Sequence, residues 1–112
     1  MAYPINSHDQ RRDPRYALQL PAQISVGSQF VLQGRLRDLS LNSAFILMKT
    51  GSVYFKTNDE VGFAIHSSSE IGADLIEGLA CISRIVSGEG LAIYFTKMDK
   101  NSTLRLRELL KQ

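Results

Sequence analysis

The chain has 112 residues, 44% of them hydrophobic, and its 13 Lys and Arg against 11 Asp and Glu give a formal net charge of +2. This describes one ordinary globular domain, excludes a multidomain enzyme, and gives no support for binding a nucleic acid polymer by bulk charge. A single cysteine, Cys81, excludes an intramolecular disulfide framework. No signal-like start and no run near the ~20 apolar residues of a membrane helix occur, so we expect a cytoplasmic protein without a membrane span.

The N-terminal segment differs from the rest of the chain. Residues 1–15 are polar, contain Pro4 and Pro14, and show no apolar periodicity. This pattern predicts a flexible arm over residues 1–15, followed by one folded domain over residues 16–112.

Two alternating runs then predict a β-hairpin. Apolar residues recur at every second position over residues 18–26 and again over residues 30–39, with Gly27 at the turn between the runs. Pro21 lies on the polar phase of the first run, which indicates an edge position or a bulge there.

Four further strands are predicted, over residues 44–48, 61–65, 75–86 and 91–95. The run over 75–86 is long enough for a helix, but its β-branched residues and single parity favour a strand. Cys81 lies within that run, where the usual role of a cysteine is that of a small buried hydrophobe. A turn over residues 87–90 joins the last two strands.

The C-terminal segment changes periodicity. Leu106, Leu109 and Leu110 recur at helical spacing, after several N-cap candidates over residues 99–103. Six strands followed by one helix predict a mainly β fold, a six-stranded antiparallel β-barrel with a C-terminal α-helix.

Catalytic and metal-binding patterns are nearly absent. His8 and His66 have no acid at an evident orienting position, and two scattered histidines make no metal site. The sequence has no GxGxxG or GxxxxGK[ST] phosphate loop. We therefore expect a protein that is not an enzyme and that uses no metal and no cofactor.

An arginine cluster in the arm is a candidate anion site. Arg11, Arg12 and Arg15 surround Asp13-Pro14, and proline biases the residue before it toward extended backbone. Guanidinium groups bind phosphate oxygens and the O6/N7 edge of guanine bidentately. For an isolated cluster, solvated charge beside the first strand is the commoner explanation.

A second candidate lies at the end of the hairpin. Period two places Asp38 and Ser40 on one face of the strand. A carboxylate accepts hydrogen bonds from the N1–H and N2 amino groups of guanine, and a serine hydroxyl can assist. The alternative is that both residues are ordinary turn formers.

Taken together, RxxxR at Arg11 to Arg15 and DxS at Asp38 and Ser40 resemble the PilZ domain family of bacterial cyclic di-GMP receptors, over nearly the whole chain. The resemblance implies a non-catalytic barrel that binds cyclic di-GMP between the arginine loop and the barrel face. It implies that Arg11 and Arg15 contact phosphates and guanine edges, with Arg12 assisting, and that Asp38 and Ser40 hold a guanine.

Ser43 departs from the family pattern, [D/N]xSxxG, at its final position. A glycine at that position would allow positive φ or close approach of the ligand to the backbone. If the site needs positive φ, serine costs on the order of 1 kcal/mol, or about a tenfold loss of affinity. We therefore count Ser43 in the ligand site and expect weakened binding.

Three functions are weighed. The first is a cyclic di-GMP receptor in which the ligand pins the arm and changes affinity for an unidentified protein partner, as a monomer or weak dimer. The second is a degenerate adaptor that has lost the ligand, for instance in motility or secretion machinery. The third, a barrel for single-stranded nucleic acid, has little support because Tyr16 beside Arg15 is the only aromatic–basic pairing near the arm.

Overall fold

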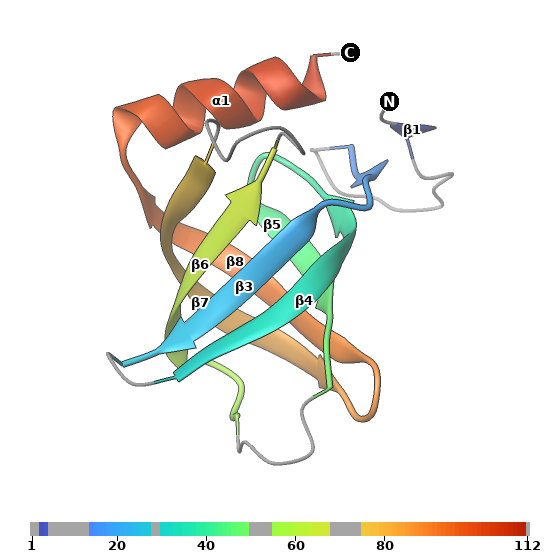
Figure 1. Cartoon of the computed structure of the whole chain (residues 1–112), viewed down its shortest axis with the longest axis vertical. Coiled ribbons are helices and arrows are strands. Elements are labelled where there is room, and N and C mark those ends of the chain that lie inside the picture. The colour runs from blue at the N-terminus through green and yellow to red at the C-terminus, as the bar shows by residue number, and fades with distance from the viewer. Residues whose placement is uncertain (1–2, 5–13, 28–29, 50–54, 68–74, 112) are drawn as a thin grey trace.

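Six strands whose apolar side chains alternate form the body of the protein in the computed structural model (Figure 1), which describes residues 3–4, 14–27, 30–49, 55–67 and 75–111. The six strands are β3 (Pro21–Val26), β4 (Phe30–Leu39), β5 (Ser43–Leu47), β6 (Glu60–His66), β7 (Leu75–Val86) and β8 (Gly90–Met98). They match the six predicted runs, and the bounds of β7 are those predicted.

The six strands close on themselves. Neighbouring strands follow the order β4, β3, β6, β7, β8, β5, and β5 pairs again with β4, every pair being antiparallel. Two further strands, β1 (Tyr3–Pro4) and β2 (Tyr16–Ala17), form a short ribbon that extends from β4. The predicted mainly β fold with a closed six-stranded barrel is confirmed.

The barrel interior is filled by aliphatic side chains with two aromatic rings among them. Phe63 and Phe95 stack with their ring centroids 4.6 Å apart. The fully buried aliphatic side chains of this interior are Ile24, Leu36, Leu39, Ile46, Ile65, Ile76, Ile82, Leu91 and Ile93. Burial of these side chains is the main source of stability.

Two side chains lie elsewhere than predicted. Pro21 is neither on an edge strand nor at a bulge: it is the first residue of β3, which pairs with β4 on one side and, from Ala22 onward, with β6 on the other. A missing N–H is tolerated at the first residue of a strand. Cys81 is half-buried rather than part of the core, because its neighbours Ala80 and Ile82 take the interior phase of β7.

The helix α1 (Lys100–Leu110) lies across one end of the barrel (Figure 1). Asp99 is its N-cap, and the carboxylate accepts from the backbone N–H of Ser102 at 2.7 Å. Leu106 and Leu110 are buried against the barrel interior. The Ser102 hydroxyl accepts from the N–H of Glu77 at 3.1 Å, which attaches the helix to β7.

Two glycines at the turn between β7 and β8 meet different structural requirements, one of backbone conformation and one of space. Gly88 has φ +76 and faces open space, whereas a Cβ on Gly90 would lie 2.1 Å from the carbonyl oxygen of Ile46 on β5. Gly90 therefore allows β8 and β5 to approach each other closely where the barrel closes. In the part of the chain that the structure describes, no helix is long and apolar enough to cross a membrane.

Candidate functional site

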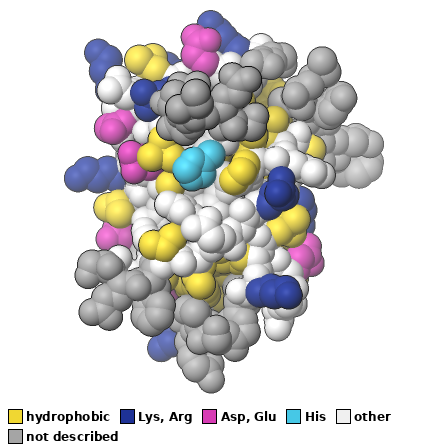
Figure 2. Space-filling view, in the orientation of Figure 1, with side chains coloured by type: hydrophobic (Ala, Val, Ile, Leu, Met, Phe, Trp, Pro, Cys, Tyr) yellow, Lys and Arg dark blue, Asp and Glu magenta, His cyan; other side chains and the backbone are white. Residues whose placement is uncertain are grey.

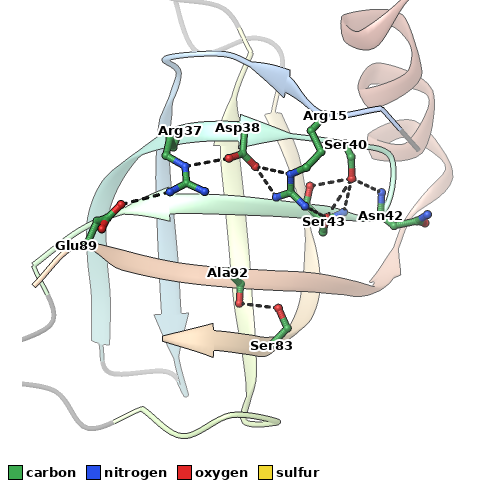
Figure 3. A network of polar contacts seen from close by, with 9 residues as sticks. All are labelled: Arg15, Arg37, Asp38, Ser40, Asn42, Ser43, Ser83, Glu89 and Ala92. Carbon is green, nitrogen blue, oxygen red and sulfur yellow. Dashed lines mark hydrogen bonds and ion pairs between the residues drawn. The ribbon is translucent and has the colours of Figure 1, made fainter. Parts of the chain in front are cut away.

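Backbone pairing brings Arg15, the last residue of the predicted arm, to the end of the hairpin. In the β2–β4 ladder, Tyr16 lies opposite Leu39 and Ala17 lies opposite Asp38. Arg15 directly precedes β2, so its side chain reaches the outer face of the barrel beside Asp38 (Figure 3). Residues far apart in the sequence thus meet through main-chain hydrogen bonds.

Arg15 and Asp38 form a charge-assisted pair at this point. The Arg15 Nε donates to Asp38 Oδ1 at 2.9 Å, and Nη2 donates to the same oxygen. The Asp38 side chain is only 2% exposed and that of Arg15 13%, so the pair is weakly screened by solvent.

A β-bulge turns Asp38 outward. The register of the β4–β5 ladder shifts between Leu36 and Asp38, with Arg37 as the extra residue. Leu36 and Leu39 both point into the core, although they are three positions apart, and Asp38 therefore lies on the outer face opposite Phe45. The face that Asp38 occupies depends on this bulge.

Arg37 is a second cation on the same carboxylate. Its Nε donates to Asp38 Oδ2 at 3.0 Å, and its Nη1 donates to Glu89 Oε1 at 3.3 Å (Figure 3). Both oxygens of Asp38 are therefore engaged, Oδ1 by Arg15 and Oδ2 by Arg37.

Phe45 forms the base of the site. It is fully buried but does not belong to the side chains that fill the barrel interior. The guanidinium carbon of Arg37 lies 3.9 Å from the centroid of its ring, and that of Arg84 lies 5.7 Å from it. The ring thus binds two guanidinium groups by its face on the outside of the barrel.

Ser40 holds the turn that joins β4 to β5. Its hydroxyl oxygen accepts from the backbone N–H groups of Asn42 at 3.2 Å and Ser43 at 3.1 Å. The Ser40 N–H donates to the carbonyl oxygen of Ser43 at 2.8 Å. Ser40 therefore acts as a turn former in this structure, which was the alternative to ligand binding.

Ser43 joins the arginine to this turn. Its hydroxyl oxygen accepts from Arg15 Nη1 at 3.2 Å and lies 3.1 Å from the Ser40 hydroxyl. Among the described non-glycine residues only Asn58 has φ in the left-handed range, so the backbone penalty considered for Ser43 does not arise in this structure. What distinguishes serine from glycine here is the hydroxyl.

The predicted site residues therefore divide into two groups. Arg15, Asp38, Ser40 and Ser43 meet in one connected network (Figure 3). Arg11 and Arg12 lie outside the described residues. Three members of the site that the sequence reasoning missed are Arg37, Phe45 and Glu89. Only the position of Arg37 beside the DxS motif could have pointed to it.

Other chemistries find little support in the described ranges. They contain no group of three His, Cys, Asp or Glu side chains that could hold a metal ion. On the face seen in Figure 2, the coloured Lys and Arg side chains lie scattered at the periphery among acidic ones. The described side chains on this face form no continuous basic track of the kind that a nucleic acid polymer would follow.

Comparisons with known proteins agree on one domain type. The family model of the PilZ domain matches residues 9–112. No curated protein sequence matches the chain.

Solved structures share the fold at low sequence identity. The Bacillus subtilis inhibitor of motility MotI/DgrA superposes with a TM-score of 0.72 at 16% identity, over 93% of this chain and 54% of that one, so this chain spans about half its length. The PilZ domain of YcgR from Escherichia coli, solved with c-di-GMP, gives 0.71 at 15% over 91% and 89%. The PilZ domain of CeSA from a cellulose-synthesizing bacterium gives 0.63 at 18% over 85% and 93%.

Proposed function

We propose a function from the premise that this chain belongs to the PilZ domain family. PilZ domains are receptor and adaptor domains and not enzymes, and the YcgR domain was solved with c-di-GMP. The proposed function is that of a cytoplasmic cyclic di-GMP receptor, which needs no further cofactor and converts ligand binding into altered contact with a partner protein.

The observation that carries this proposal is the pattern of hydrogen bonds made by the Arg15 guanidinium. A guanidinium has five N–H donors, and Asp38 and Ser43 engage one on each of the three nitrogens. Among the contacts of the described residues, none engages the second N–H of Nη1 or of Nη2. Two donors on a planar fork match a phosphate or the O6/N7 edge of guanine.

The rest of the proposed ligand set follows the family motif. Arg11 and Arg12 would add cations from the arm for a ligand that carries two phosphates. Asp38, Ser40 and Ser43 would face a guanine. Because Arg15 and Arg37 already occupy both oxygens of Asp38, guanine would gain bidentate access to that carboxylate only by displacing one of these contacts.

A backbone contact offers a route from this site to a partner surface. The carbonyl oxygen of Asn42, within the Ser40–Ser43 turn, accepts from the N–H of Phe95 at 2.8 Å. Phe95 lies on β8, which leads directly into α1. A ligand that reorders the turn would therefore act on β8 and, through it, on the helix end of the barrel.

Isothermal titration with cyclic di-GMP tests the proposal. The wild-type chain should bind and Arg15→Ala should not, because that variant removes the guanidinium group that would bind phosphate or guanine. Arg35→Ala is the matched control, since Arg35 is exposed and its Nη1 donates to the carbonyl oxygen of Gln19 at 3.4 Å, away from Asp38 and Ser43 in the contacts of the described residues. Absence of heat and of thermal stabilisation with wild-type protein at high micromolar ligand would overturn the proposal.

The second candidate function is an adaptor without ligand. The observation in its favour is that the polar groups of Asp38, Ser40 and Ser43 are already satisfied by one another and by Arg15. Limited proteolysis of the arm separates the two functions. Cyclic di-GMP should protect the arm of a receptor, whereas the arm of an adaptor would be cleaved equally with and without the nucleotide.

A further inference from the structure

We infer that Ser43, where the family pattern has glycine, is a positioning residue for Arg15: its hydroxyl fixes the orientation in which the guanidinium presents its two other N–H groups, one on Nη1 and one on Nη2. The inference deepens the proposed function and rests on it for the identity of the ligand. It reverses the expectation that serine at this position weakens binding.

The contact with Asp38 alone leaves the Arg15 guanidinium free to rotate about one oxygen atom, and the contact with Ser43 prevents this rotation. Nε and Nη2 of Arg15 both converge on a single oxygen, Asp38 Oδ1. A planar group held at one acceptor atom can pivot about that atom. The hydrogen bond from Nη1 to Ser43 Oγ at 3.2 Å adds a second anchor on another residue and stops the pivot.

Ser43 is itself held in place. It is the first residue of β5, where it lies opposite Tyr94 of β8. Its N–H donates to the Ser40 hydroxyl at 3.1 Å, and its carbonyl oxygen accepts from the Ser40 N–H at 2.8 Å. Both backbone polar groups of Ser43 are thus hydrogen-bonded. Because its backbone is fixed, its hydroxyl can orient another side chain.

The donors and acceptors of the turn allow this role. The Ser40 hydroxyl oxygen accepts from two backbone N–H groups, so its two lone pairs are used. The Ser43 hydroxyl oxygen accepts from Arg15 Nη1, and the one Ser40 O–H lies within reach of two acceptors on Ser43, the carbonyl oxygen at 3.3 Å and the hydroxyl at 3.1 Å. The proton of the Ser43 hydroxyl is therefore not needed by the turn. Glycine at this position would supply neither the acceptor nor that proton.

The test compares three substitutions at Ser43 by isothermal titration with cyclic di-GMP. Ser43→Ala and Ser43→Gly should each weaken binding about tenfold, as expected for loss of one hydrogen bond to a charged group. Ser43→Thr keeps the hydroxyl, suits a strand, and should bind within about twofold of wild type. In an Arg15→Lys background, Ser43→Ala should have little further effect. Equal or tighter binding by Ser43→Gly would overturn the inference.

A ligand-free measurement separates this inference from the proposed function. The Arg15 Nε–H resonance, assigned by its absence in Arg15→Lys, should be sharp in the wild-type protein and broadened in the Ala and Gly variants but not in Ser43→Thr. If wild-type protein does not bind cyclic di-GMP, the proposed function fails while this resonance still decides the positioning role. An unchanged resonance in both Ser43→Ala and Ser43→Gly would overturn that role.

Discussion

Arg15 and Asp38 are 23 positions apart in the sequence, yet the Nε of Arg15 lies 2.9 Å from Oδ1 of Asp38. The β2–β4 ladder places Ala17 opposite Asp38, and the bulge at Arg37 turns the carboxylate outward to meet the guanidinium. The pair joins the segment before β2 to the barrel wall, so substitutions at either end should affect both stability and ligand binding.

Asp38→Asn should lower the free energy of unfolding by roughly 1–3 kcal/mol, because a nearly buried carboxylate that receives Arg15 and Arg37 would become an amide with one acceptor oxygen. Urea denaturation measures the change. Asp59→Asn is the control, since Asp59 is exposed and accepts from the N–H of Lys56 within a turn. A loss no larger than that of the control would show that the two guanidinium contacts contribute little.

Phe45 and Arg37 should be energetically coupled. Phe45→Leu removes the ring face over which the Arg37 guanidinium lies at 3.9 Å. A double-mutant cycle with Arg37→Ala should give a coupling energy of about 1 kcal/mol. The same cycle with Tyr94, an exposed aromatic residue, in place of Phe45 should give a value near zero. Additive effects of Phe45→Leu and Arg37→Ala would contradict a stabilising cation–π contact between these two side chains.

Gly90→Ala should destabilise the protein more than Gly88→Ala. The new Cβ at position 90 would lie 2.1 Å from the Ile46 carbonyl oxygen, so the β5–β8 ladder must shift, at about 2–3 kcal/mol. At position 88 the space is open and only the strain of φ +76 applies, at about 1 kcal/mol. Thermal unfolding of the two variants gives the comparison, and a reversed order would contradict it.

Asp99 should make helix stability depend on pH. Hydrogen bonds from the backbone and the hydroxyl of Ser102, with the nearby charge of Arg105, lower the pKa of Asp99 below its ordinary value of 3.8. The charged carboxylate is therefore favoured in the folded state. Its contribution to stability is present above the unfolded pKa and is lost as the pH falls through the lower folded pKa.

Two substitutions at Asp99 check this by melting temperature between pH 7 and pH 3. Asp99→Ala should melt below wild type at pH 7, and the difference should shrink toward pH 3 as the wild-type carboxylate is protonated. Asp99→Asn keeps an N-cap acceptor without a titrating group, so it should melt close to wild type at pH 7. A constant difference between wild type and Asp99→Ala across this range would rule out the titration.

Much of the fold could be predicted from periodicity because each barrel strand has one face in the core. The run over 75–86 was assigned as a strand on its β-branched residues, and β7 spans those residues. The bulge at Arg37 could not be predicted, since it depends on how β5 aligns with β4. The ribbon of β1 and β2 could not be predicted either, because a strand of two residues is too short to show an alternating pattern.

The site was predictable only in part. The motifs predicted Arg15, Asp38, Ser40 and Ser43 as parts of one ligand site, but not that these side chains bind one another. Phe45 was predicted within a mostly apolar strand, and its position under Arg37 on the outer face follows from the register of β4 and β5. The backbone penalty considered for Ser43 does not arise in this structure, because the residue belongs to β5 and its φ is not positive.

The closure of β5 onto β4 has a consequence for self-association. Strand edges are where sheets of separate molecules join, and a closed barrel has none. Among the described strands, the ladder that leaves the barrel ends at β1, whose one assigned pairing is with β2. Within the described part of the chain, edge-to-edge sheet growth between two copies would therefore have to begin at this two-residue ribbon, which offers few main-chain hydrogen bonds.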